Sequence, residues 1–441
     1  MNEEQYQEIK RYYNECKVDV SLKPGDKKYV DFDKEELRGP KCREQLCKRI
    51  EFDDDNSHLL FSGYRGGGKT TELFLLKEAL EKMGYLVIYG DAKQYMNLTM
   101  PLSVGEILLS LAGVFDDFFK DELKVDLGKE GIWERLKEFA GTEIQFQEFG
   151  ISAGGVEVKA ALVGNQTFKK QLNDFMAQRL QNFKKLVYDY INEAVALATK
   201  KCKDRFDGDC KDVVLIFDSL EQLRGDTPYA QEVRQSLSEV FFHMSDYLQI
   251  PCSAVYTVPP WMAFQAGVEA EWDVCQFGMV RVRHKDGSED EKGLQKLREF
   301  IDRRVPLQDV FGNENSSVIH DMVLCTGGYL RDLLRCVRDF LIEVNKNDDL
   351  PLPEDRQKEI WEKVRIRLAN EYHTPLVKED LEWFAQIHDT KDLEQTRHKE
   401  MEKIAGFLDY HFILGYRDKE NKWYDLHPIL AEHPAVKNLC D

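Results

Sequence analysis

The sequence contains no long apolar run. Nowhere does it approach the roughly 20 consecutive apolar residues that a helix needs to cross a bilayer. The first residues show no basic segment followed by an apolar core, so we expect no secretory leader. Positive charge is also scarce, with 61 Lys and Arg against 80 Asp and Glu and a net charge of −19. This balance opposes broad attraction to nucleic acid or anionic lipid. We therefore expect a cytoplasmic protein with no membrane partner.

The ten cysteines are scattered and form no C-x-x-C pair and no regular spacing with histidine. These absences argue against a zinc site and a disulfide framework, and buried thiols in a reducing compartment account for the cysteines. The chain has 441 residues, of which 42% are hydrophobic. That is enough for two or three domains with cores of their own.

A glycine-rich segment carries the strongest signal, because it fits the phosphate-binding pattern G-x-x-x-x-G-K-[ST]. Its candidate nucleotide-binding residues are Gly63, Tyr64, Arg65, Gly66, Gly67, Gly68, Lys69, Thr70 and Thr71. The glycines let successive backbone N–H groups approach a phosphate. Lys69 is then expected to reach the β and γ phosphates, and the Thr70 hydroxyl to complete a Mg²⁺ shell, with Thr71 as a spare hydroxyl.

The flanks of this segment match the pattern, and a second strand supplies an acid. Residues 58–62 predict a short buried strand and residues 72–80 predict a helix. Residues 213–218 form an apolar run that ends in Asp218. Such a run is typical of a parallel strand covered on both faces, and open α/β sheets bind ligands at the carboxyl ends of their strands. Asp218 is therefore the candidate metal-associated acid.

The surrounding chain alternates between strands and helices. After a polar arm at residues 1–50, a core at 51–284 contains further strands and helices. We expect strands at 85–89, 252–257 and 274–282, and helices at 103–112 and 232–247. This alternation predicts a parallel sheet covered by helices.

The alternation stops between residues 115 and 211, which we interpret as an insertion. Residues 143–149 and 156–159 alternate in polarity around a glycine-rich stretch and predict a hairpin. Residues 167–201 predict one long amphipathic helix. Its apolar stripe either packs inside its own domain or forms a surface for another subunit.

The last third of the chain predicts two smaller domains. Helices at 297–304 and 329–344 belong to a helical lid at residues 285–372. A tail at 373–441 predicts three helices followed by a hairpin, a plan that resembles a winged helix. The helices fall near 380–387, 390–398 and 401–410, and the hairpin strands at 412–416 and 422–426. Such modules either read DNA or serve as packing units. From residue 375 to 441 there are nine Lys and Arg against fourteen Asp and Glu, a balance of 9 − 14 = −5 that favours packing.

These motifs together resemble the AAA+ superfamily, and more narrowly its signal-transduction (STAND) and origin-recognition-like branches. The resemblance rests on the phosphate loop, the strand ending in Asp218, a later strand ending in Thr257 and the Gly-Gly-Tyr-Leu-Arg stretch that contains Arg331. It covers residues 29–346. It implies an α/β fold in which a P-loop NTPase sheet covered by helices is followed by a helical lid and a C-terminal winged-helix-like domain. It also implies ATP and Mg²⁺ as cofactors.

The resemblance assigns roles to single residues. Thr257 is implied as a sensor of the γ-phosphate, against the alternative of an ordinary strand-end threonine. Arg331 is implied as a second sensor on the lid, against the alternative of a solvated helix arginine. Lys69, Asp218 and Glu221 are the candidate catalytic residues, with Glu221 orienting the attacking water.

Two departures from the AAA+ pattern affect the expected activity. Typical members carry an acid directly after the metal aspartate, where this chain has Ser219. Ring-forming members usually present an arginine finger in the segment equivalent to 258–277, which contains no Arg or Lys. A motor that depends on such a finger is disfavoured, and slow or regulated ATP hydrolysis is expected.

Three functions therefore compete. The leading hypothesis is an ATP-dependent switch that controls a protein effector or its own assembly, which by resemblance includes bacterial signalling and anti-phage defence. The second is a DNA-bound initiator or loader whose winged helix binds DNA. The third, a small-molecule kinase, lacks a recognisable acceptor pocket. ATP is preferred over GTP by the resemblance.

Overall fold

The computed structural model divides the chain into two compact units. The first contains Met1–Cys42, Gly63–Glu72 and Phe277–Asp441, and the second contains Arg43–Ser62 and Leu73–Gln276. Within the described residues no helix is both long and apolar enough to span a membrane. The structure describes residues 1–151, 155–203, 210–223, 229–265, 267–313, 315–374, 376–393, 401–419 and 421–440.

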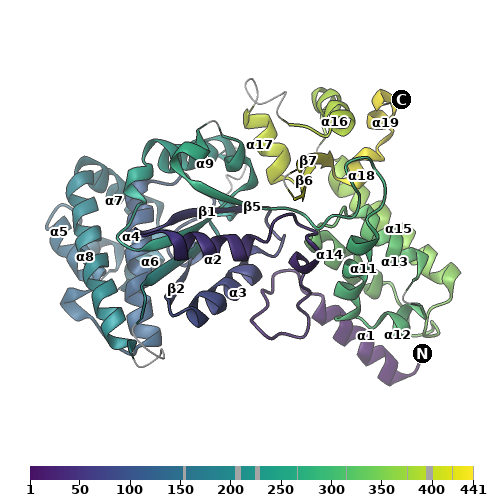
Figure 1. The fold of residues 1–441 in the computed structure, drawn as a ribbon, viewed down its shortest axis with the longest axis horizontal. Helices are drawn as coiled ribbons and strands as arrows, with labels where there is room; N and C mark the ends of the chain where they lie inside the picture. The colour runs from purple at the N-terminus through teal and green to yellow at the C-terminus, as the bar shows by residue number, and fades with distance from the viewer. Residues whose placement is uncertain are drawn as a thin grey trace. The chain divides into compact units, whose positions relative to one another are not determined.

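A five-stranded sheet has the strand order β2-β3-β4-β1-β5, and Figure 1 labels its strands β1, β2 and β5. The β1–β4, β2–β3 and β3–β4 pairings are all parallel, as the alternation of strands and helices predicted. Only the last strand differs clearly from expectation, since it ends at Phe277 instead of residue 282. The strands are β1 (His58–Gly63), β2 (Leu86–Asp91), β3 (Val213–Asp218), β4 (Ser253–Val258) and β5 (Asp273–Phe277).

Burial explains why these segments became strands. Every residue of β3 and β4 is buried, which requires covering layers on both faces of the sheet. Register places Phe61 of β1 opposite Thr257 of β4, and Phe217 of β3 opposite Tyr256 of β4. Because the three strands run parallel, their carboxyl ends lie at one edge of the sheet, which is where α/β folds bind ligands.

Helix α4 (Val104–Asp117) covers β2 at very short range. Gly90 of β2 has no side chain, and a Cβ atom built there collides with Cγ2 of Val114. On its other side α4 packs against α8 (Leu180–Lys201), as Figure 1 shows. Helix α4 thus lies in contact with both β2 and helix α8 of the insertion.

The predicted hairpin in the insertion is wrong. Residues 146–149 form a 3-10 turn, and residues 156–159 lie inside helix α6 (Gly155–Gly164). Short alternating stretches fit a helix as well as a strand, and tertiary packing decided between them. Gly155 approaches the indole of Trp133 so closely that a Cβ atom would overlap it. The glycine-rich residues 152–154 lie outside the described residues.

The predicted long helix is divided in two. Helix α7 (Gln166–Gln178) ends at Arg179, whose φ of −127° is not helical, and α8 then begins. Phe139 of α5 (Ile132–Ala140) contacts a phenylalanine from each helix, with ring centroids 5.5 Å from Phe175 and 5.9 Å from Phe183. The apolar stripe is therefore buried inside its own unit, as in the first of the two alternatives.

Farther on, the predicted helix 232–247 is shorter: α9 (Ala230–Ser238) continues only as a π turn and a 3-10 turn.

The first unit contains ordered helices where the sequence predicted only an arm. Helix α1 (Glu3–Glu15) has a capping box at Asn2, and α2 (Cys42–Phe52) begins at the boundary with the second unit.

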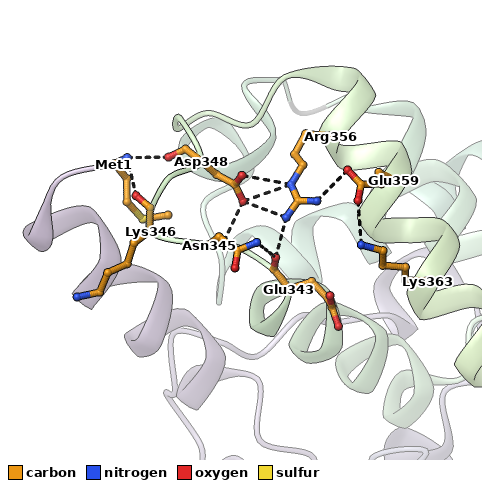
Figure 2. Close-up of polar contacts among 8 residues, drawn as sticks. All are labelled: Met1, Glu343, Asn345, Lys346, Asp348, Arg356, Glu359 and Lys363. Carbon is orange, nitrogen blue, oxygen red and sulfur yellow. Dashed lines mark hydrogen bonds and ion pairs between the residues drawn. The ribbon is translucent and has the colours of Figure 1, made fainter.

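In the lid, Arg356 pairs with Asp348 at 3.2 Å and with Glu359 at 2.9 Å (Figure 2). The lid helices are α11 (Glu291–Asp302), α12 (Leu307–Phe311), α13 (Ser317–Cys325), α14 (Leu330–Ile342) and α15 (Glu354–His373).

The tail has the hairpin that the sequence predicted. Strands β6 (Ile413–Asp418) and β7 (Asn421–Leu426) pair antiparallel after α16 (Lys378–Thr390) and α17 (Met401–Asp409). Residues 394–400, which include most of the predicted middle helix, lie outside the described residues. Two short helices, α18 (Pro428–Ala431) and α19 (Pro434–Cys440), complete the tail.

A buried carboxylate joins the tail to the lid. Asp332 of α14 accepts a 2.7 Å hydrogen bond from the Tyr372 hydroxyl of α15. His427, which precedes α18, lies 3.5 Å from the same carboxylate and stacks on Tyr372. Burial alone raises the pKa of Asp332, but its contacts with His427, Tyr372 and Arg335 outweigh burial and lower it to about 2. The lid and the tail therefore share a polar core.

The contact between β2 and α4 gives a testable prediction. We expect Gly90→Ala to lower the free energy of unfolding by about 1 to 3 kcal/mol, because the added methyl group overpacks the interface with Val114. Gly164→Ala is the matched control, since nothing lies within 4 Å of a Cβ at that position. Urea unfolding of both variants measures the difference. Equal stabilities would show that α4 does not pack on β2 as described.

Candidate functional site

The phosphate loop follows β1 and precedes α3 (Lys69–Lys82), so the predicted order of strand, loop and helix is confirmed. Gly66 and Gly68 have φ angles of 76° and 101°, in the region that side chains rarely adopt. Glycine at positions 66 and 68 is thus required by the backbone itself. With the parallel sheet, this order of strand, loop and helix confirms the predicted α/β fold class.

Lys69 lies inside the loop. Its side chain is buried, and its Nζ donates hydrogen bonds of 2.8 Å to the carbonyl oxygens of both Gly63 and Tyr64. An ammonium group has three donors and no acceptor, so carbonyl oxygens are suitable partners for it. A phosphate that enters the loop would compete with these carbonyls for the ammonium group.

The carbonyl oxygen of Arg65 is the point where lid and tail contact the loop. The Tyr329 hydroxyl donates to it at 2.9 Å, and Nε2 of His411 lies 3.1 Å away. Because a carbonyl only accepts, Nε2 of His411 is the donor. The two rings stack with centroids 4.6 Å apart and planes 14° apart. His411 has a φ of 61°, an unusual backbone for a residue other than glycine, which marks it as a constrained position.

Arg331 also lies against the loop. A Cβ atom built on Gly66 would come within 2.5 Å of Nε of Arg331, so any side chain at Gly66 would displace the guanidinium. The same guanidinium pairs with Asp19 at 3.1 Å. The structure thus places this predicted sensor beside the predicted phosphate site, and its role in sensing stays a prediction.

Two other residues of the motif have structural contacts. The Tyr64 side chain is buried, and burial raises the pKa of its hydroxyl well above the ordinary value. Oγ1 of Thr71 accepts a 3.1 Å hydrogen bond from the backbone N–H of Leu22. Thr71 is therefore engaged with the N-terminal segment, and Thr70 stays the predicted metal-binding hydroxyl of the loop.

In the second unit, Asp218 lies at the carboxyl end of β3. It is fully buried and accepts 2.7 Å hydrogen bonds from the Tyr89 hydroxyl and from the N–H of Ser219. Burial and the nearby carboxylate of Asp218 raise the pKa of Tyr89, so its hydroxyl remains a donor. These two donors orient the carboxylate.

Thr257 and Glu221 lie near the same strand end. Ser219 adopts a left-handed conformation with a φ of 75°, and Leu220 begins a 3-10 turn that contains the buried Glu221. Oγ1 of Thr257 accepts a 3.1 Å hydrogen bond from the N–H of Leu220. Thr257 thus fixes the turn that follows Asp218, in agreement with the structural alternative, and its role as a sensor stays a prediction.

The donor chemistry is compatible with Mg²⁺ bound together with a nucleotide. Among the described residues there is no group of three or more His, Cys, Asp or Glu side chains that could hold a metal. Mg²⁺ in nucleotide sites is usually held by one or two protein oxygens, with phosphates and water completing its shell. The carboxylate of Asp218 is a ligand of that kind, whereas a site built only from protein ligands is not seen in this part of the chain.

Sequence reasoning missed Arg38, Tyr89, Tyr329 and His411. Tyr329 lies in the Gly-Gly-Tyr-Leu-Arg stretch, so its closeness in sequence to Arg331 could have identified it as a candidate site residue. Arg38 and His411 are far from the loop in the sequence and belong to no pattern. Only the folded chain brings them to it.

No protein-family model matches the chain, and no curated protein matches it. Solved structures do match. One is Drosophila ORC bound to DNA, at 10% identity and a TM-score of 0.38, covering 100% of this chain and 93% of that one. Another is Cdc6p from Pyrobaculum aerophilum, at 12% identity and a TM-score of 0.37, covering 97% of each chain. At these values neither match assigns a function, ligand or partner to this chain.

The bond between Tyr329 and Arg65 gives a second prediction. Tyr329→Phe keeps the ring stacked on His411 but removes the hydroxyl donor, so we expect the free energy of unfolding to fall by about 1 kcal/mol. Tyr410→Phe is the control, because Tyr410 is half exposed and its hydroxyl bonds to no described residue. Chemical denaturation of both variants compares their free energies of unfolding. If Tyr329→Phe is as stable as the control, the bond is absent in solution.

Proposed function

We propose that the protein is an ATP-dependent molecular switch that hydrolyses ATP slowly and controls an effector protein or its own assembly. The observation that supports this most directly is the carbonyl of Arg65, which bonds to Tyr329 of the lid and His411 of the tail. The phosphate loop therefore shares hydrogen bonds with both of the domains that a switch would move.

A bound phosphate would alter these contacts. Lys69 now bonds to the carbonyls of Gly63 and Tyr64, the latter adjacent to Arg65. Moving the ammonium group to a phosphate changes the hydrogen bonding of the loop immediately beside the two donors. Each of those bonds is worth about 1 kcal/mol net, and allosteric coupling between two sites is typically about 1 to 3 kcal/mol. The free energy of these two bonds together is thus large enough to couple the loop to the lid and the tail.

The residues have distinct roles in this proposal. Lys69 and the loop N–H groups hold the phosphates, Thr70 and Asp218 hold Mg²⁺, and Arg331 senses the terminal phosphate. Mg²⁺, when bound, would neutralise charge that develops on the phosphates. Glu221 would orient the attacking water. Ser219 replaces the acid that usually polarises this water, which supports slow turnover.

The partner is proposed to be a protein, with bacterial signalling or anti-phage defence suggested by the STAND resemblance. The contacts of the hairpin support a packing role for the tail. A Cβ atom at Gly39 would lie 2.5 Å from Cβ of Arg417, and Asp418 pairs with Arg281 at 3.4 Å. One of the hairpin's basic side chains therefore packs on the N-terminal segment.

The alternative is an initiator-like ATPase that binds DNA through the tail. Charge reversal at Arg417, Lys419 and Lys422 tests it, because DNA binding must neutralise phosphates and is sensitive to salt. DNA binding that disappears in this variant would replace the packing role. No change in DNA binding would leave the effector hypothesis in place.

The switch itself is tested with Lys69→Ala. We expect the wild type to retain or slowly hydrolyse ATP and to change its mass in solution between ATP and ADP, and the variant to do neither. Removing Lys69 deletes the cation that is bonded to the carbonyls of Gly63 and Tyr64. Nucleotide content, phosphate release and light scattering give the three readouts. Lys82→Ala, in the same helix but exposed, is the control.

The outcomes separate the parts of the proposal. Nucleotide binding that does not depend on Lys69 would remove the phosphate-loop assignment. Binding without any change in mass or partner capture would leave an ATPase but remove the assembly switch. Fast turnover without a partner, at the rate of a motor ATPase, would contradict the regulated mechanism.

A further inference from the structure

A buried arginine beside the phosphate loop is not explained by the contacts of the folded chain. Arg38 is only 4% exposed, although arginine is rarely buried without a partner. Its guanidinium lies 4.9 Å from the ring centroid of Phe32 and 4.3 Å from that of Phe277. Among the residues that the structure describes, no carboxylate pairs with it and no acceptor bonds to its Nε.

The edge of this guanidinium faces the loop. A Cβ atom built on Gly68 would lie 3.8 Å from one terminal nitrogen of Arg38 and 4.0 Å from the other. Both rings lie within cation–π distance of the guanidinium carbon, and the N–H donors of a guanidinium point outward in its plane. A bidentate acceptor such as a phosphate approaches in that plane. Gly68 directly precedes Lys69, so the free edge of Arg38 lies next to the residues expected to hold phosphate.

Burial makes the charge of Arg38 costly. Burial is the largest influence on the pKa of Arg38 and lowers it, and the carboxylates of Glu72 and Asp33 only partly oppose this. Burying a charge without a paired counter-charge is strongly unfavourable, and the cation–π contacts offset only part of that cost. A side chain held in this position is stabilised most by an anion that arrives from solution.

We propose that Arg38 is a second cationic ligand for the phosphates of the nucleotide, beside Lys69. The proposal rests on the function proposed above, because it requires a nucleotide in the loop. It assigns to the N-terminal segment, which the sequence suggested was only an arm, a direct contribution to binding. It also accounts for the position of the guanidinium beside Phe32 and Phe277, with its terminal nitrogens near Gly68.

A purely structural role for Arg38 makes the opposite prediction. If the guanidinium serves only to stack between two rings, Arg38→Met should destabilise the nucleotide-free protein and leave nucleotide affinity nearly unchanged. If it is a phosphate ligand, Arg38→Met should stabilise the nucleotide-free protein, because methionine fills the space without an unpaired charge. The same change should weaken nucleotide binding.

The experiment measures thermal stability without nucleotide and the affinity for ATP and ADP by calorimetry. For Arg38→Met we expect a higher melting temperature without nucleotide and a loss of affinity of about thirty-fold or more, as for removal of one partner of a buried charge pair. Arg38→Lys is the matched control. It keeps the charge but not the fork of donors, and should have an intermediate affinity.

Each outcome decides one point. A wild type that binds neither ATP nor ADP would overturn the proposed function itself. A wild type that binds nucleotide, with Arg38→Met binding equally well, would overturn only the role of Arg38. A melting temperature that falls in Arg38→Met, with unchanged affinity, would establish the structural role instead.

Discussion

The hydrogen bonds to the carbonyl of Arg65 are the interaction on which the organisation of the first unit depends. One acceptor atom in the phosphate loop receives donors from Tyr329 and His411, which are separated from it by hundreds of residues along the chain. Both donors lie in a stacked pair of rings, so the two bonds are geometrically linked. The loop that carries the phosphate-binding motif is thereby hydrogen-bonded to the lid and the tail through a backbone carbonyl, so a change in its hydrogen bonding would affect both.

Positive charge surrounds the loop in a protein that is otherwise acidic. Lys69 is held by loop carbonyls, Arg331 lies on Gly66, and Arg38 faces Gly68 from between two rings. A net charge of −19 gives no reason to bury cations in one place. A polyphosphate bound at this loop would neutralise these cations. Its oxygens would then accept hydrogen bonds from fixed protein donors in place of water.

The sequence predicted the sheet and its loop well because their signals are local. Apolar runs such as that of β3 determine buried strands, and glycine at positions 66 and 68 is required by the backbone of the loop. It failed in the insertion, where residues 156–159 are helical although their polarity alternates. Four residues cannot distinguish a period of 2 from one of 3.6, and contact with Trp133 settled the question.

The sequence by itself determined the fold class, the phosphate loop and the acid that ends β3, since each is encoded in a contiguous segment with its own periodicity or spacing. Only the tertiary structure decided which distant side chains meet the loop. Arg38 and His411 carry no motif, and their positions follow from long-range packing of the N-terminal segment and the tail. Contacts of that kind depend on the whole fold, because no local pattern specifies which surfaces will be brought together.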